Sequence, residues 1–215
     1  MTTASFDPAE PWWRGFETPL TAFAIAELLS EAGVPAGVAN VVTTTDPGAV
    51  VYSLLEHRAV RKLSFTGSTS VGRHLLCRAA GRVQNVSMEL GANAPFVVCD
   101  DTDLDAAVAG ALVAKFRNSG QACTAVNRFF VHSGVVDEFT RRFSKAVDTL
   151  HLGPATDPAS QIGPLISAAA VRRIQAALDE ALASGARIVN APVTVPDRGT
   201  SSRRSSSATF LKTVS

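Results

Sequence analysis

The chain has 215 residues, with 46% hydrophobic and 18% charged residues and a formal net charge of +1. This composition is typical of a globular protein, and its charge favours neither nucleic acid nor an anionic membrane surface as a partner. The longest apolar run, residues 106 to 114, is far shorter than the ~20 residues that a membrane span needs. The N-terminus lacks the basic start and apolar run of a secretory signal, so we expect a cytoplasmic protein. From its charge and its short apolar runs, we expect it to bind no nucleic acid and no membrane.

Metal binding is not indicated by the cysteines or the histidines. The three cysteines are widely separated: Cys77, Cys99 and Cys123. They form no C-x-x-C pair, and the four histidines lack the H-x-x-x-H spacing of a helical metal site. We therefore expect no metal.

The first half of the chain alternates between helix and strand patterns. Residues 1–17 show no period and are expected to be a disordered leader. Thr18 and Pro19 then predict a helix start and Gly33 its end. Further elements are expected as a strand at 38–43, a helix at 48–57, a strand at 62–65, a helix at 73–80 and strands at 85–90 and 95–100. This alternation predicts an α/β fold with a parallel sheet.

The second half of the chain contains longer helices. Asp103 is expected to cap a helix from Leu104 to about Asn118, with an apolar stripe at fourfold spacing. Later elements are expected as a strand at 128–132, a helix at 135–150 with its aromatic residues in the core, a helix at 167–184 and a strand starting at 188. Residues 190–215 are too polar to bury and are expected to be a disordered tail.

A glycine turn follows the strand at 62–65. Gly67 and Gly72 enclose a polar run that leads into a helix, and such a turn presents backbone N–H groups to a phosphate. A plain tight turn is the alternative. The Gly-Lys-Ser or Gly-Lys-Thr of a nucleotide-hydrolysing loop is absent from the turn.

Cys123 is a candidate nucleophile because it lies just after a helical run, among small and polar residues. A thiol reacts as thiolate, and hydrolysis of a covalent intermediate needs a carboxylate that activates water, a role that Glu89 could fill. The alternative is an ordinary buried cysteine and a surface glutamate. A cysteine hydrolase that uses Cys123 without a cofactor is a more distant alternative, since no histidine is nearby in sequence.

The sequence around these residues resembles that of the aldehyde dehydrogenase superfamily, and within it most closely the succinate-semialdehyde dehydrogenases. The segments that carry the resemblance, in matching order and spacing, are Phe65-Thr66-Gly67-Ser68, Met88-Glu89-Leu90-Gly91, Phe116-Arg117-Asn118 and Gly120-Gln121-Ala122-Cys123. The resemblance implies part of a Rossmann-like cofactor domain at 18–88, followed by the first part of the catalytic domain at 89–189.

The resemblance also implies residue roles. Cys123 would attack an aldehyde, with succinate semialdehyde as the expected substrate, and Glu89 would activate the water that hydrolyses the thioester. Arg117 would bind the distal carboxylate of the substrate through its fork of N–H groups, with a structural salt bridge as the alternative. The contacts to NAD or NADP are implied at Gly67, Ser68, Gly72 and Leu90.

The chain departs from the family pattern at several places. Ala92 stands where a second glycine is usual, which puts the geometry at Glu89 in question. Ala125 replaces a second cysteine found in some succinate-semialdehyde enzymes, so no redox switch is expected at this loop. The segments that supply the oxyanion asparagine and the cofactor ribose contacts are absent. We therefore expect an internal fragment of a family member. The alternative to an active enzyme is a non-catalytic remnant or a fragment that associates with full-length subunits.

Overall fold

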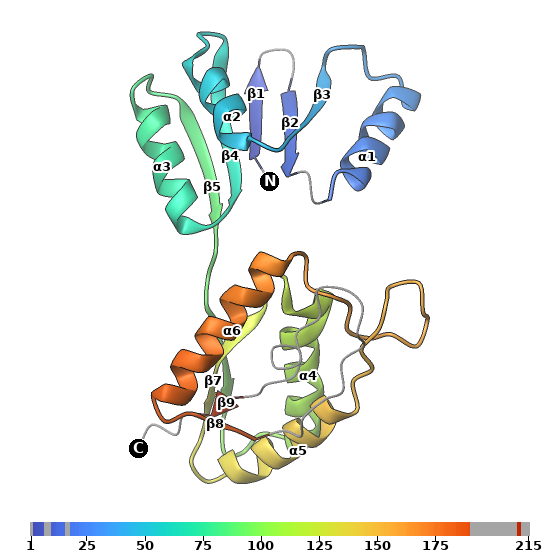
Figure 1. Cartoon of the computed structure of the whole chain (residues 1–215), viewed down its shortest axis with the longest axis vertical. Coiled ribbons are helices and arrows are strands. Elements are labelled where there is room, and N and C mark those ends of the chain that lie inside the picture. Colours follow the sequence, from blue (N-terminus) through green and yellow to red (C-terminus); the bar gives the residue numbers. More distant parts are fainter. Residues whose placement is uncertain (1, 7–9, 16–17, 190–209, 212–215) are drawn as a thin grey trace. The chain divides into compact units, whose positions relative to one another are not determined.

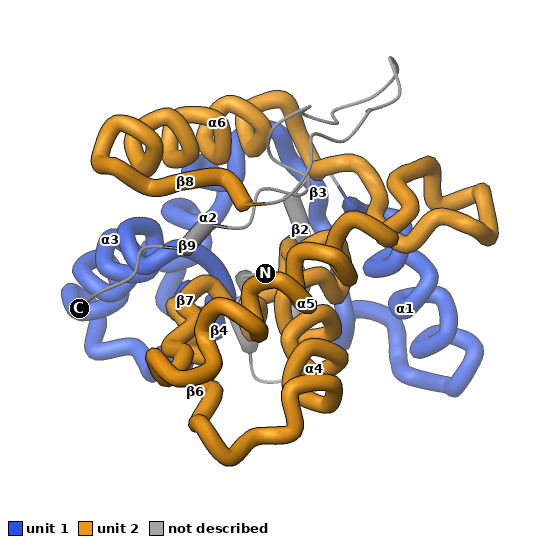
Figure 2. Tube along the Cα trace, turned by 90° about the horizontal axis from the view of Figure 1, so that it is seen from below, with its two compact units in different colours: residues 1–91 blue, residues 92–215 orange. Residues whose placement is uncertain are grey.

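The structure is a computed structural model that describes residues 2–6, 10–15, 18–189 and 210–211. It divides into two compact units, Met1–Gly91 and Ala92–Ser215, which are coloured separately in Figure 2. The division falls three residues after the domain boundary expected from the sequence. Each unit is described by itself.

The first unit is a five-stranded sheet with three helices (Figure 1). Its elements are β1 (Thr2–Phe6), β2 (Glu10–Gly15), α1 (Leu20–Glu31), β3 (Ala39–Thr44), α2 (Pro47–Glu56), β4 (Val60–Gly67), α3 (Thr69–Ala80) and β5 (Asn85–Leu90). The strand order is β3-β2-β1-β4-β5. Strands β2 and β3 are parallel, as are β4 and β5, whereas β1 runs antiparallel to both of its neighbours. The α/β fold is confirmed, but the sheet is mixed rather than wholly parallel.

The first 17 residues differ from the expected disordered leader. Strands β1 and β2 lie within them, while residues 1, 7–9 and 16–17 lie outside the described residues. Helix α1 also starts differently, because Pro19 occupies the cap position without a side-chain bond and Thr18 is not the cap. Its end is as predicted, since Gly33 has a φ of +86° that favours glycine.

The core of the first unit lies between β4 and the helices α2 and α3. From Lys62 to Thr66, strand β4 alternates between more exposed and buried positions because successive side chains point to opposite faces of the sheet. The buried residues are Val51, Leu55, Leu63, Phe65, Leu75 and Ala79. This packing fixes α3 against β4 and β5, and with it the glycine turn that joins β4 to α3.

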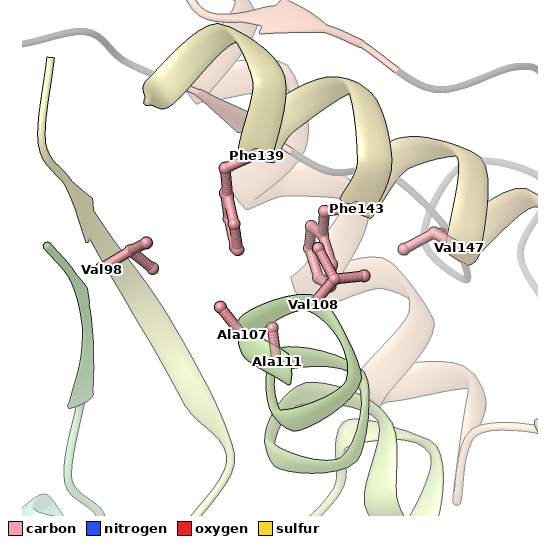
Figure 3. Packing of buried hydrophobic residues seen from close by; sticks show 7 residues of the cluster. All are labelled: Val98, Ala107, Val108, Ala111, Phe139, Phe143 and Val147. Carbon is pink, nitrogen blue, oxygen red and sulfur yellow. The ribbon is translucent and has the colours of Figure 1, made fainter. Parts of the chain in front are cut away.

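The second unit packs two helices on a parallel pair of strands. Its elements are β6 (Ala94–Val98), α4 (Leu104–Phe116), the short turn η1 (Arg117–Gly120), β7 (Val126–Val131), α5 (Val136–Asp148), α6 (Ala168–Ala183) and β8 (Arg187–Ile188). The predicted cap is confirmed, since the Asp103 side chain accepts hydrogen bonds from the N–H groups of Asp105 and Ala106. The core is shown in Figure 3 and consists of Val98, Ala107, Val108, Ala111, Phe139, Phe143 and Val147.

The predicted aromatic face of α5 is confirmed by this core. The rings of Phe139 and Phe143 are stacked with their centroids 5.6 Å apart, and the ring centroids of Phe143 and of Phe129 in β7 are 5.4 Å apart. Most of the expected tail, residues 190–209 and 212–215, lies outside the described residues. Within it, β9 (Phe210–Leu211) pairs antiparallel with β8.

Candidate active site

The turn between β4 and α3 is the candidate phosphate site. Ser68 caps α3 by accepting a hydrogen bond from the Val71 N–H at 3.4 Å, and its hydroxyl lies 3.1 Å from that of Ser70. Ser68, Thr69 and Ser70 are exposed. The first N–H groups of a helix have no partner inside the helix, and the helix dipole favours an anion there. The turn therefore fits a cofactor phosphate at Ser68 and the residues that follow it.

Gly72 serves the packing of this turn. It is buried, and a Cβ at this position would overlap Leu90 Cδ2 and lie 3.3 Å from Leu90 Cδ1. Gly67 is similarly close to the ring of Phe65, whose Cε1 and Cε2 would lie 3.1 Å from an added Cβ. The missing side chain at Gly72 thus lets α3 approach β5, whereas the one at Gly67 leaves room for the Phe65 ring of the same strand. Direct contacts of Gly67, Gly72 and Leu90 with a cofactor stay predictions.

Glu89 lies at the same edge of the sheet as the glycine turn. In the parallel pairing of β4 with β5, Glu89 is opposite Thr66 and Leu90 is opposite Gly67, and the Gly91 N–H donates to the Gly67 carbonyl at 3.0 Å. Ligands of open α/β sheets bind outside the carboxyl ends of parallel strands. Glu89 is exposed, so its carboxylate can meet water.

The segment that follows Glu89 enters the second unit and is fixed there by an arginine. Arg128 of β7 donates to the Asn93 carbonyl from Nε at 2.9 Å and from Nη2 at 2.7 Å. A guanidinium fork on one acceptor fixes the position of that acceptor. The sequence indicates only that Arg128 lies in a strand and gives no sign of this contact.

Helix α4 leads into the loop that carries Cys123. After the helix the chain turns through three successive residues with positive φ: Asn118 (52°), Ser119 (56°) and Gly120 (74°). Cys123 follows in an exposed position, and the loop ends at the buried residue Ala125. The alternative of an ordinary buried cysteine is therefore wrong for Cys123.

Arg117 is exposed at the start of this turn. Among residues 18–189, the structure shows no ion pair of its guanidinium, so the alternative of a structural salt bridge has no partner in this part of the chain. Cys123 and Arg117 both belong to the second unit, whereas Glu89, Gly67, Ser68, Gly72 and Leu90 belong to the first.

Three polar residues that precede Cys123 in the chain carry no sequence signal of a role at the site: Lys115, Ser119 and Gln121. Ser119 Oγ accepts a hydrogen bond from the Gly163 N–H at 2.9 Å, and Gln121 Oε1 accepts one from the Ile166 N–H at 2.9 Å. Lys115 Nζ donates to Asn127 Oδ1 at 2.9 Å, and burial lowers the pKa of its amine. The partners of Ser119 and Gln121 lie some 45 residues away in sequence, so no local pattern marks them.

The described residues contain no group of three or more histidine, cysteine, aspartate or glutamate side chains that could hold a metal ion. Among the helices that the structure describes, none has the length and apolar character to cross a membrane.

The fold and the candidate residues define an α/β protein with part of a Rossmann-like cofactor domain and an exposed cysteine on a separate unit. Residues 16–203 match the sequence pattern of the family described as "Aldehyde dehydrogenase family", so the chain belongs to that family.

Proteins of similar sequence include named semialdehyde dehydrogenases. The chain is 51% identical over 173 residues to the NADP(+) succinate-semialdehyde dehydrogenase of Escherichia coli strain K12, a match that covers 80% of this chain and 36% of that protein. It is 46% identical over 174 residues to glutarate-semialdehyde dehydrogenase of Pseudomonas aeruginosa, with 81% and 36% covered. The chain therefore spans little more than a third of the length of these relatives.

Solved structures are similar as well. The crystal structure of an NADP dependent enzyme of E. coli has a TM-score of 0.83 at 48% identity and covers 88% of this chain and 39% of its own. A structure of 3,6-anhydro-L-galactose dehydrogenase in complex with NAP has a TM-score of 0.78 at 36% identity, with 85% of this chain and 39% of its own covered. The family is NAD(P)-dependent.

Proposed function

We propose that this chain carries the nucleophile, the general base and part of the cofactor site of an NAD(P)-dependent dehydrogenase that oxidises succinate semialdehyde to succinate. The exposed position of Cys123 at the end of the left-handed turn after α4 carries the proposal. A thiol held on a defined loop and open to solvent can meet an aldehyde, whereas a buried thiol cannot.

In the proposed reaction, the Cys123 thiolate attacks the aldehyde carbon, and the carbonyl oxygen becomes the oxyanion of a thiohemiacetal. The nicotinamide, when bound, supplies the acceptor for the hydride that leaves this carbon. The remaining thioester is hydrolysed by water, from which Glu89 removes a proton, and the acid and the Cys123 thiolate are released. The overall balance is aldehyde, oxidised cofactor and water on one side, and acid, reduced cofactor and a proton on the other.

Arg117 is the proposed group for the distal carboxylate of succinate semialdehyde. Its guanidinium is exposed, and it stands six positions before Cys123 on the turn that presents the thiol. Two parallel charge-assisted hydrogen bonds would favour an aldehyde with a terminal carboxylate over one without it. Ser68 and the N-terminus of α3 are the proposed partners of a cofactor phosphate.

Cofactor reduction with succinate semialdehyde tests the proposal, with NAD and NADP offered separately. We expect turnover that is lost in Cys123→Ala and kept in Cys99→Ala, which removes a second exposed cysteine of the same unit. Turnover that survives in Cys123→Ala, or that disappears equally in Cys99→Ala, would refute the role of Cys123. Arg117→Met is expected to raise KM for succinate semialdehyde by at least about tenfold, since a charged hydrogen bond contributes ~1.5–3 kcal/mol.

A second candidate function is association with full-length subunits of the family without independent catalysis. Val97 and Phe130 are register partners in the β6–β7 pair and are 66% and 53% exposed. An exposed apolar pair of this kind favours contact with another chain. This candidate predicts no turnover by the isolated chain and co-purification with the E. coli succinate-semialdehyde dehydrogenase, reduced by Val97→Ser and Phe130→Ser.

A further inference from the structure

The turn before Cys123 has an unusual backbone for residues that are not glycine. Asn118 and Ser119 both have positive φ, and Ser119 carries a Cβ that disfavours this conformation. Such backbone persists only where surrounding structure holds it. Hydrogen bonds to and within the turn therefore have to supply this support.

Part of the support comes from the segment that precedes α6. Ser119 Oγ accepts from the Gly163 N–H and Gln121 Oε1 accepts from the Ile166 N–H, both at 2.9 Å. The two side chains flank Gly120, so the left-handed turn is held at its middle residue and at the residue that follows it. Two further bonds close the turn on itself: the Gln121 N–H donates to the Asn118 carbonyl at 3.0 Å, and Asn118 Nδ2 donates to the Gln121 carbonyl at 3.2 Å.

The segment that donates these bonds is itself anchored. The N–H groups of Gln161 and Ile162 donate to the His151 carbonyl at 2.8 and 3.0 Å, and Ile162 is only 5% exposed. On its other side, Ser167 caps α6 by accepting from the Ala170 N–H. The Gly163 and Ile166 amides thus belong to a folded support and not to a free loop.

We propose that Ser119 and Gln121 are positioning residues that lock the nucleophile loop to residues 163–166 and so aim the Cys123 thiol for attack on a carbonyl. This proposal rests on the proposed function, since it assumes that Cys123 is the nucleophile. It assigns to Ser119 and Gln121 no contact with substrate, and their effect on the reaction passes through the backbone of residues 118–123.

Acylation by 4-nitrophenyl acetate, read at each cysteine by peptide mass spectrometry, tests the lock without any cofactor. Cys77 and Cys99 are exposed and serve as references in the same sample. In Ser119→Ala and in Gln121→Leu we expect the ratio of Cys123 to Cys99 acylation to fall roughly fivefold, the effect of losing one hydrogen bond of ordinary strength. Ser119→Gly is expected to behave like Ser119→Ala although glycine removes the backbone strain.

A matched variant controls for general loss of stability. Ser144→Ala removes a hydroxyl that donates to the Val189 carbonyl at 3.1 Å. It loses a bond between a side chain and the backbone of the same unit, and this bond involves neither the loop of Cys123 nor the segment that supports it. We expect the acylation ratio to stay unchanged in Ser144→Ala, and an equal fall in this control would overturn the proposal.

A second readout separates the lock from the role of Cys123. Hydrogen exchange in the wild type is expected to show protected amides at Gly163 and Ile166, with protection lost at Gly163 in Ser119→Ala and at Ile166 in Gln121→Leu. Unprotected amides in the wild type would overturn the lock whatever Cys123 does. Protected amides together with Cys123 acylation no faster than that of Cys99 would instead refute the nucleophile and, with it, the aiming role.

Discussion

Substitution of Gly72 by alanine tests the packing that fixes the glycine turn. Gly72 lies inside α3, and an added methyl group would overlap Leu90 Cδ2 and approach Leu90 Cδ1 to 3.3 Å. Gly110 lies inside α4, and there an added Cβ would lie 3.8 Å from Phe96 Cζ, an ordinary contact. The two positions share a helical backbone and differ in the space available.

The expected magnitudes follow from this difference. Alanine is favoured over glycine in a helix interior by ~1 kcal/mol, so Gly110→Ala should stabilise the protein by about that amount. At Gly72 the same gain is opposed by overpacking, which typically costs ~1–3 kcal/mol. We therefore expect Gly72→Ala to range from neutral to about 2 kcal/mol destabilising, which is ~1–3 kcal/mol worse than Gly110→Ala.

Urea unfolding followed by circular dichroism measures both changes, and a double-mutant cycle identifies the cause. In a Leu90→Ala background the overlap is gone, so Gly72→Ala should recover the helix gain and give a coupling energy of ~1–3 kcal/mol. If Gly72→Ala stabilises as much as Gly110→Ala, or if its effect is the same with and without Leu90, the packing argument is wrong.

Two further predictions concern charged side chains of the second unit. Hydrogen bonds from Arg141, followed by those from Arg142, lower the pKa of Glu138 to about 2. The folded state therefore favours the carboxylate, so this stabilisation is present above pH ~4.5 and is lost as the pH falls toward 2. Urea titrations across this window should show that the free energy of unfolding depends less on pH in Glu138→Gln than in the wild type. An unchanged pH dependence would contradict the assignment. Burial lowers the pKa of Lys115, whose Nζ donates to Asn127. Because burying the ammonium costs free energy that this bond only partly offsets, Lys115→Met should leave the free energy of unfolding within about 1 kcal/mol of the wild type or raise it. A loss above about 2 kcal/mol would show that the ammonium is needed.

Elements with strong local signals could be predicted from the sequence. Asp103 caps α4 as expected, and the spacing of Phe139, Phe143 and Val147 identified the buried face of α5, because capping and helical periodicity act over a few residues. The insertion of β1 between β2 and β4 could not be predicted. Antiparallel pairing of β1 with β4 joins residues that are 54 positions apart (Phe6 with Val60) to 63 positions apart (Thr2 with Phe65), and it depends on contacts that no local window contains.

The candidate site was predictable to a similar extent. The residue types and spacing around Cys123 and Glu89 carried the family resemblance, and the family is confirmed by the match over residues 16–203. Their catalytic roles stay predictions. The sequence did not indicate that Gly72 is buried against Leu90, since a glycine in a turn motif looks the same whether a ligand or a side chain approaches it.

The turn before Cys123 shows why the nucleophile loop depends on the rest of the second unit. A left-handed conformation costs a residue such as Ser119 ~1–2 kcal/mol, and Asn118 less because its side chain tolerates this region. One hydrogen bond returns ~0.5–1.5 kcal/mol. The two bonds inside the turn, from the Gln121 N–H to the Asn118 carbonyl and from Asn118 Nδ2 to the Gln121 carbonyl, therefore come close to offsetting this cost. The bonds of Ser119 and Gln121 to Gly163 and Ile166 add a similar amount and tie the turn to a distant segment. The conformation in front of Cys123 therefore depends on local and tertiary bonds together, and a change confined to residues 163–166 should alter the reactivity of the thiol.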